Sequence, residues 1–81
     1  MDAKTAEQIL WKAMDKRINP IEIYYNDGTL VKGWVQGIYQ HSINLCKEVE
    51  TKWEDTDHTV DLDMIKKIIF HHLNGTNEIF E

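Results

Sequence analysis

The fold of this chain is decided by the stretch Ile21-Glu22-Ile23-Tyr24-Tyr25-Asn26-Asp27-Gly28 and the two extended runs that follow it. Apolar side chains alternate over residues 21–25, which predicts a strand with one buried face. Asp27-Gly28 then predicts a primed hairpin turn. The next run, residues 29–39, contains Gly33 and Gly37, and glycine inside a strand permits a sharp bend. These features predict a small antiparallel sheet that bends back on itself.

The second run carries apolar residues at both alternating sets of positions. One set is Val31, Val35 and Tyr39, and the other is Leu30, Trp34 and Ile38. One face is therefore expected to cover the core, and the other to meet a helix or a partner. A third strand is expected over residues 42–46.

The N-terminal residues 3–18 are predicted to form a helix. Thr5 with Gln8 resembles a capping box, and Asp2 is the alternative cap. Pro20 ends the helix, because the residue before proline is displaced from the helical region. The apolar positions recur at spacings of three and four and form one stripe, namely Ala6, Ile9, Leu10, Ala13 and Met14.

The C-terminal half reads as shorter elements. Residues 47–58 form either an extended hairpin tip or a mobile loop, and a short strand follows over 58–62. A single turn at 61–65 then leads into a strand over 67–71, with Ile68 and Phe70 pointing inward.

The fold class that follows is mainly β with an N-terminal α-helix, a five-stranded, strongly bent antiparallel barrel of the SH3/Sm-like kind. The domain is expected to span residues 1–72, with the barrel over 20–72 and a flexible tail over 73–81. A chain of 81 residues fits one domain of this size.

Composition narrows the classes of function. The net charge is −5, and residues 48–63 hold seven carboxylates against one lysine. Binding to the phosphate backbone of a nucleic acid is therefore disfavoured, because it depends on clustered positive charge. Cys46 is the single cysteine, which excludes an intrachain disulfide. There is no long apolar run and no signal-peptide pattern at the N-terminus, and we therefore expect a cytoplasmic protein without membrane contact.

A helix followed by five bent strands, with a closing turn before the last, resembles the Sm-like barrels and most closely the YolD-like family. The shared pieces are Tyr24-Tyr25 with Asn26-Asp27-Gly28, a strand carrying Gly33 and Val35, and the segment Val60-Asp61-Leu62-Asp63-Met64-Ile65. Residues 60–68 also resemble the closing strands of WYL domains. The layout around Gly28, Gly33, Val35 and Leu45 is similar to that of the bacterial RNA chaperone Hfq. The resemblance covers residues 5–71 and implies a small bacterial, plasmid or phage protein, of a family often found beside DNA-damage polymerases.

The chemistry of enzymes and metal sites is not expected. The acidic run from Asp55 lacks the glycine and glutamate of an EF-hand loop, where it has Val60 and Lys66. His58, His71 and His72 with Asp57 would be a weak zinc set, because adjacent strand residues point to opposite faces. Cys46 and His41 lack an orienting third group for nucleophilic catalysis. No phosphate-binding glycine loop precedes a helix, so we expect no catalysis, cofactor or metal.

The leading hypothesis is a non-enzymatic protein-interaction module that acts as a regulator, adaptor or inhibitor. Tryptophan and tyrosine dominate binding hot spots, and carboxylates could steer a partner with a basic surface. The alternative reading, that the aromatics are core and the acids only confer solubility, has equal weight on composition alone. The expected partner-binding residues are Trp11, Tyr24, Trp34, Trp53, Glu48, Glu50, Glu54, Asp55 and Asp57.

The alternative function is an Sm- or Hfq-like oligomer that binds nucleic acid through aromatic platforms and basic residues. Its candidate residues are Tyr24, Lys32, Lys66 and Lys67. A small-ligand sensor of the WYL kind has support from the fold only. Apolar residues on both faces of the second strand also predict self-association, with a dimer as the expected form.

Overall fold

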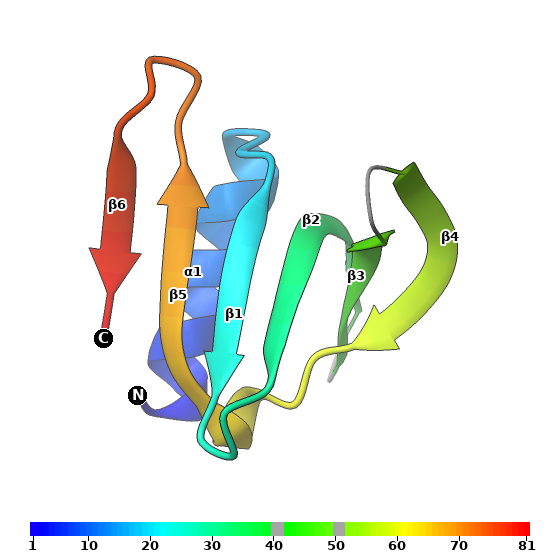
Figure 1. Cartoon of the computed structure of the whole chain (residues 1–81). Coiled ribbons are helices and arrows are strands. Elements are labelled where there is room, and N and C mark those ends of the chain that lie inside the picture. The colour runs from blue at the N-terminus through cyan, green and yellow to red at the C-terminus, as the bar shows by residue number, and fades with distance from the viewer. Residues whose placement is uncertain (40–41, 50–51) are drawn as a thin grey trace.

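The computed structural model consists of one helix, one short 3-10 helix and one antiparallel sheet (Figure 1). It describes the backbone of residues 1–39, 42–49 and 52–81, and their side chains except those of 39, 47–49 and 52–57. The elements are α1 (Ala3–Asp15), β1 (Ile21–Tyr25), β2 (Leu30–Tyr39), β3 (Ser42–Val49), β4 (Lys52–Thr59), η1 (Leu62–Met64), β5 (Ile65–His71) and β6 (Asn77–Phe80).

The sheet has six strands in the order β4-β3-β2-β1-β5-β6 and is open. The prediction of a five-stranded closed barrel was therefore wrong, although the mainly β class and the N-terminal helix are confirmed. Closure would have required β5 to pair with β4, to which η1 connects it. Instead β5 uses one edge for β1 and the other for β6, so no edge remains for β4.

β6 replaces the flexible tail that was expected over residues 73–81. A turn at Asn74-Gly75 precedes it, with Gly75 at φ 89° and the His72 N–H donating to the Thr76 carbonyl at 2.9 Å. The strand then pairs with β5 from His71↔Asn77 to Ile68↔Phe80. The Phe80 ring meets Phe70 edge to face, with 4.8 Å between ring centroids. This aromatic contact and the ladder hold the C-terminal residues on the sheet.

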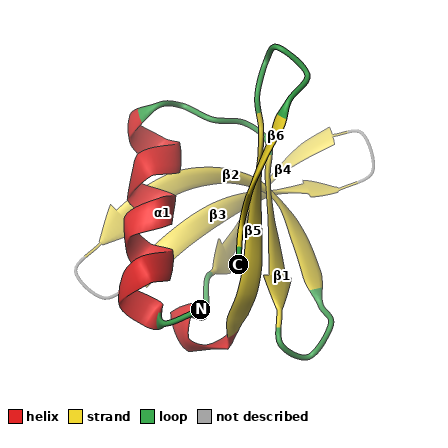
Figure 2. Ribbon diagram, turned by 90° about the vertical axis from the view of Figure 1, so that its left-hand side faces the viewer, coloured by secondary structure: helices red, strands yellow, loops and turns green. Residues whose placement is uncertain are grey.

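The hydrophobic core lies between α1 and one face of the sheet, with the helix on one side only (Figure 2). The alternation of β1 is as predicted, because Ile21, Ile23 and Tyr25 are all buried. The apolar stripe of α1 supplies Ala6, Leu10 and Ala13. The other buried members are Val31, Val35, Ile43, Leu45, Val60, Ile65, Ile68 and Phe70.

A bulge in β2 corrects the predicted face of Ile38. Val35 pairs with Leu45 and Gly37 with Asn44, so Gln36 has no Cα partner in the ladder. One extra residue reverses the alternation beyond it. Ile38 therefore packs against the core, instead of sharing the face of Leu30 and Trp34.

The β1–β2 connection also differs from the predicted primed turn. Gly28 has φ 89°, whereas Asn26 and Asp27 do not have positive φ. A primed turn of the Asp-Gly type needs positive φ at both central residues. Here the Gly28 N–H donates to the Tyr25 carbonyl at 3.0 Å, which gives a three-residue connection with glycine in the left-handed position.

α1 ends at Asp15 rather than at residue 18. The Ile18 N–H donates to the Ala13 carbonyl at 2.9 Å, and the Arg17 N–H donates to the Met14 carbonyl at 3.2 Å. These two bonds form a Schellman motif, in which the residue after the cap adopts a left-handed conformation. That residue is Arg17, with φ 53°. At the other end, Asp2 is the cap, because its carboxylate accepts the Thr5 N–H at 2.7 Å.

The polar segment after Cys46 continues the sheet. β3 extends to Val49, and β4 runs from Lys52 to Thr59, so the hairpin interpretation is confirmed over the described residues. The short strand expected over 58–62 is thus placed too late in the sequence. The turn before β5 is η1, and Ile68 and Phe70 are fully buried as expected.

Candidate functional site

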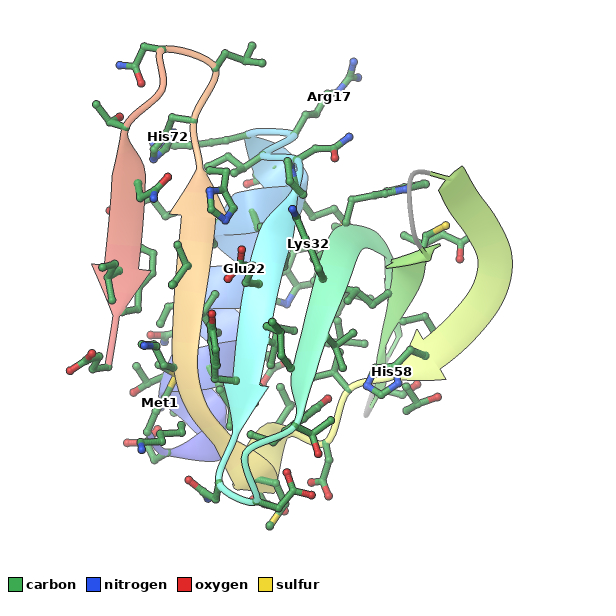
Figure 3. All side chains as sticks on the ribbon, in the orientation of Figure 1. Met1, Arg17, Glu22, Lys32, His58 and His72 are labelled. Carbon is green, nitrogen blue, oxygen red and sulfur yellow. The ribbon has the colours of Figure 1, made fainter. Side chains whose placement is uncertain are left out.

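The face of β1, β2, β5 and β6 that points away from α1 is not covered by any described element. We call it the outer face. Figure 3 shows Glu22 and Lys32 projecting from it, on the side opposite the helix. Strand alternation and the pairing registers place these side chains on it: Glu22, Tyr24, Leu30, Lys32, Trp34, Lys67, Ile69, His71, Asn77 and Ile79.

A hydrogen-bonded network crosses the outer face and is centred on Glu22. The Tyr24 hydroxyl donates to Glu22 Oε2 at 2.9 Å, and His71 Nε2 lies 2.8 Å from Glu22 Oε1. The other ring nitrogen of His71 lies 2.9 Å from Oδ1 of Asn77. The network therefore joins β1, β5 and β6, and it fixes the rotamers of the tyrosine and the histidine.

The network also changes the acidity of its members. Burial alone would raise the pKa of Glu22, but hydrogen bonds from Tyr24 and His71, with the charges of His71 and Lys32, lower it overall. The side chain of Glu22 is only 16% exposed, so these contacts are poorly screened by water. The hydrogen bond to Glu22 raises the pKa of the Tyr24 phenol.

The lowered pKa of Glu22 predicts a pH-dependent contribution to stability. The carboxylate stabilises the fold above its ordinary value of 4.5, and the contribution is lost as pH falls through the lower pKa of the folded state. Glu22→Gln should therefore reduce stability by about 1 kcal/mol at neutral pH and by less at about pH 3.

Urea unfolding of the two proteins at both pH values measures this difference. Glu81→Gln is the matched control, because it makes the same chemical change at an exposed residue. A difference between wild type and Glu22→Gln that stays constant with pH would contradict the assignment.

Apolar and cationic side chains surround the network. Tyr24 lies between Leu30 on β2 and Lys67 on β5, and Lys67 Nζ is 4.5 Å from the centroid of the tyrosine ring. In the next row Ile69 is flanked by Glu22 and Ile79. Leu30 and Ile79 are 48% and 57% exposed, which is high for large aliphatic side chains. The outer face therefore combines exposed apolar area with positive charge.

A second polar contact lies at the opposite end of the sheet. The Tyr25 hydroxyl is 2.9 Å from His58 Nε2, and both residues line a cavity of about 330 Å³ with Asp27 and Asp61. Burial, with the charges of the two aspartates, raises the pKa of the Tyr25 phenol. The geometry ties β4 to β1 across the bend, although the two strands do not pair.

The structure brings together some of the residues singled out from the sequence. Tyr24, Lys32 and Lys67 share the outer face, and Lys66 is exposed next to Lys67. Trp11 lies apart on α1 and is 43% exposed. Trp34 is half-buried and borders a cavity of about 330 Å³ beside the end of α1. The remaining candidates have side chains outside the described residues, namely Glu48, Glu50, Trp53, Glu54, Asp55 and Asp57.

Sequence reasoning missed Glu22 and the exposed aliphatic pair Leu30 and Ile79 as site residues, and it considered His71 only as a zinc ligand. Alternation on β1 already placed Glu22 with Tyr24 on the face away from the core. His71 reaches this face because β5 pairs with β1, and no local sequence pattern identifies which distant strand pairs with β1. The histidine set considered for zinc does not assemble, because His58 lies far from His72 (Figure 3) and His71 and His72 contact different carboxylates.

Within the described part of the chain, no group of three or more metal-ligating side chains is positioned to hold an ion. None of its helices combines the length and apolar character that crossing a bilayer requires. Comparison of the chain with family models, with curated proteins and with solved structures found no match.

Proposed function

We propose that this protein is a non-enzymatic binding module whose outer face docks a partner protein. The observation that carries the proposal is the apolar area that four neighbouring strands, β2, β1, β5 and β6, present opposite the core. It comes from the exposed side chains of Leu30 and Ile79 and the half-buried side chains of Tyr24 and Ile69. Aromatic and aliphatic side chains at the centre of a face, with charges around them, are the usual anatomy of a protein interface.

The charges of the outer face define the chemistry of the partner. Lys32 and Lys67 lie on this face of a chain whose net charge is −5. Glu22, the carboxylate between them, accepts from Tyr24 and contacts His71. The fitting partner presents apolar side chains beside carboxylates, because this pattern is complementary in both polarity and sign.

The acidic segment expected to steer a basic partner has its side chains outside the described residues, so it stays a separate prediction. The YolD-like resemblance and the cytoplasmic location are proposals as well. Both are compatible with a small regulator or adaptor, but neither assigns a role to any residue of the outer face.

A second candidate function is binding of single-stranded nucleic acid. It is favoured by one observation, the gathering of Tyr24, Lys32 and Lys67 on the outer face. It is disfavoured by the position of Lys67 over the tyrosine ring, which occupies the surface on which a base would stack. The net negative charge also opposes it.

Selection from a displayed library of random peptides tests the proposal directly. Enriched peptides should combine apolar and acidic residues, and their synthetic forms should bind wild type at least tenfold more tightly than the Leu30→Glu or Ile79→Glu variants. Lys4→Gln, an exposed change on α1, is the control and should bind as wild type.

Three results would overturn the proposal. They are peptides that bind all variants equally, no enrichment at all, and binding of a labelled oligonucleotide alone at low salt. Light scattering at tens of micromolar tests the separate expectation of self-association, which a monomer mass would contradict.

A further inference from the structure

A cavity of about 490 Å³ lies where the end of α1 meets the β5–β6 turn. Its polar lining comes from two segments that are far apart in the sequence. Lys16, Arg17 and Asn19 follow the helix, and His71, His72 and Asn74 come from the end of β5 and the turn. Figure 3 shows Arg17 and His72 at this same end of the molecule.

The lining is cationic and amide in character, and it contains no carboxylate. Two carboxylates outside the lining contact its imidazoles: Glu22 on the outer face lies 2.8 Å from His71 Nε2, and Glu78 lies 3.1 Å from His72 Nε2. Lys16 and Arg17 are exposed and carry the permanent positive charges. Guanidinium, ammonium and amide N–H groups around one space are the donors that bind phosphate oxygens.

The backbone at Arg17 supports a role for its side chain. Arg17 has φ 53°, and this position of a Schellman motif is usually glycine because other residues are strained there. Strain retained at a residue whose side chain lines a cavity points to function rather than to folding. Ile18 and Leu73 add apolar lining for the organic part of a ligand.

We propose that this cavity binds a small ligand carrying a phosphate monoester. Its volume lies within the range of small-molecule sites, roughly 300–1,000 Å³, and suits a ligand of mononucleotide size. The cavity and the outer face are separate proposed sites, one for a small phosphate ligand and the other for a partner protein. His71 lies at the border between them.

Calorimetric titration of the full chain at low salt tests the proposal, with adenosine monophosphate as the probe. Adenosine, which lacks the phosphate, and inorganic phosphate, which lacks the nucleoside, are the comparison ligands. The monophosphate should bind saturably and adenosine should not. Binding of inorganic phosphate at similar strength would still support a phosphate site, and would assign the affinity to the phosphate alone.

Variants locate the site. Lys16→Gln and Arg17→Gly should each weaken binding about tenfold, because each removes a charged donor. Lys4→Gln makes the same chemical change as Lys16→Gln, but in the first turn of α1 and away from the cavity, and should bind as wild type. Arg17→Gly is informative because it should raise the melting temperature while it weakens binding, so a loss of affinity cannot be a loss of folding.

The proposal is overturned by either of two results. One is the absence of saturable binding of monophosphate and inorganic phosphate up to about 10 mM. The other is unchanged affinity in both cavity variants. Neither result bears on peptide binding by the outer face, which depends on different variants.

Discussion

Phe70→Ala is expected to lower the free energy of unfolding by about 3–5 kcal/mol, the range measured for buried aromatic residues in other proteins. Phe70 is fully buried and packs edge to face on Phe80, so the change leaves a cavity and also removes the contact that seats β6. A domain of this size has a total stability of roughly 4–12 kcal/mol, so the variant should lose at least about a quarter of that stability.

Urea unfolding followed by tryptophan fluorescence measures the effect. Ile79→Ala is the matched control on the neighbouring strand, because Ile79 is 57% exposed and should change stability by less than about 0.5 kcal/mol. Equal losses in the two variants would show that the inward and outward faces of β5 and β6 are assigned wrongly.

Removal of residues 77–81 is the second change with a large expected effect. It should lower stability by about 2–4 kcal/mol, because the β5 edge loses its ladder and the core loses the half-buried Phe80. The truncation also removes two contacts of Lys12 on α1. Its Nζ lies 5.6 Å from the centroid of the Phe80 ring and 3.6 Å from Glu78 Oε2.

Hydrogen exchange distinguishes a β6 strand that is paired with β5 from a C-terminal tail that makes no contact with the sheet. The amides of β5 that face β6 should exchange faster in the truncated chain, while those of β3 keep their order of protection. A shortened chain with unchanged melting temperature would instead favour the flexible tail that the sequence suggested.

Much of the local structure is readable from residue types. Alternation over residues 21–25 predicted the bounds of β1, and the apolar stripe together with Pro20 predicted α1 to within three residues of its end. The error at that end has a specific cause. Arg17 takes a left-handed conformation that glycine normally adopts, so no sequence signal marked the stop.

The candidate site was predictable only in part. Tyr24, Lys32 and Lys67 were selected for their side-chain chemistry, and the structure places them on one face. Their neighbours Ile79 and Asn77 could not be included, because residues 73–81 were expected to form a flexible tail. The four residues of β6 read Asn-Glu-Ile-Phe and show no alternation of polar and apolar side chains, so nothing local distinguishes an edge strand from an extended tail.

The sequence by itself determined the elements that depend on neighbours along the chain: the amphipathic helix, the alternating first strand and the position of the Asp27-Gly28 turn. Only the tertiary structure decided that β5 pairs with β6 and leaves the sheet open, and that Arg17 and His72 line one cavity. The physical reason is that local preferences act over a few residues, whereas strand pairing is a competition between distant edges for the same backbone hydrogen bonds.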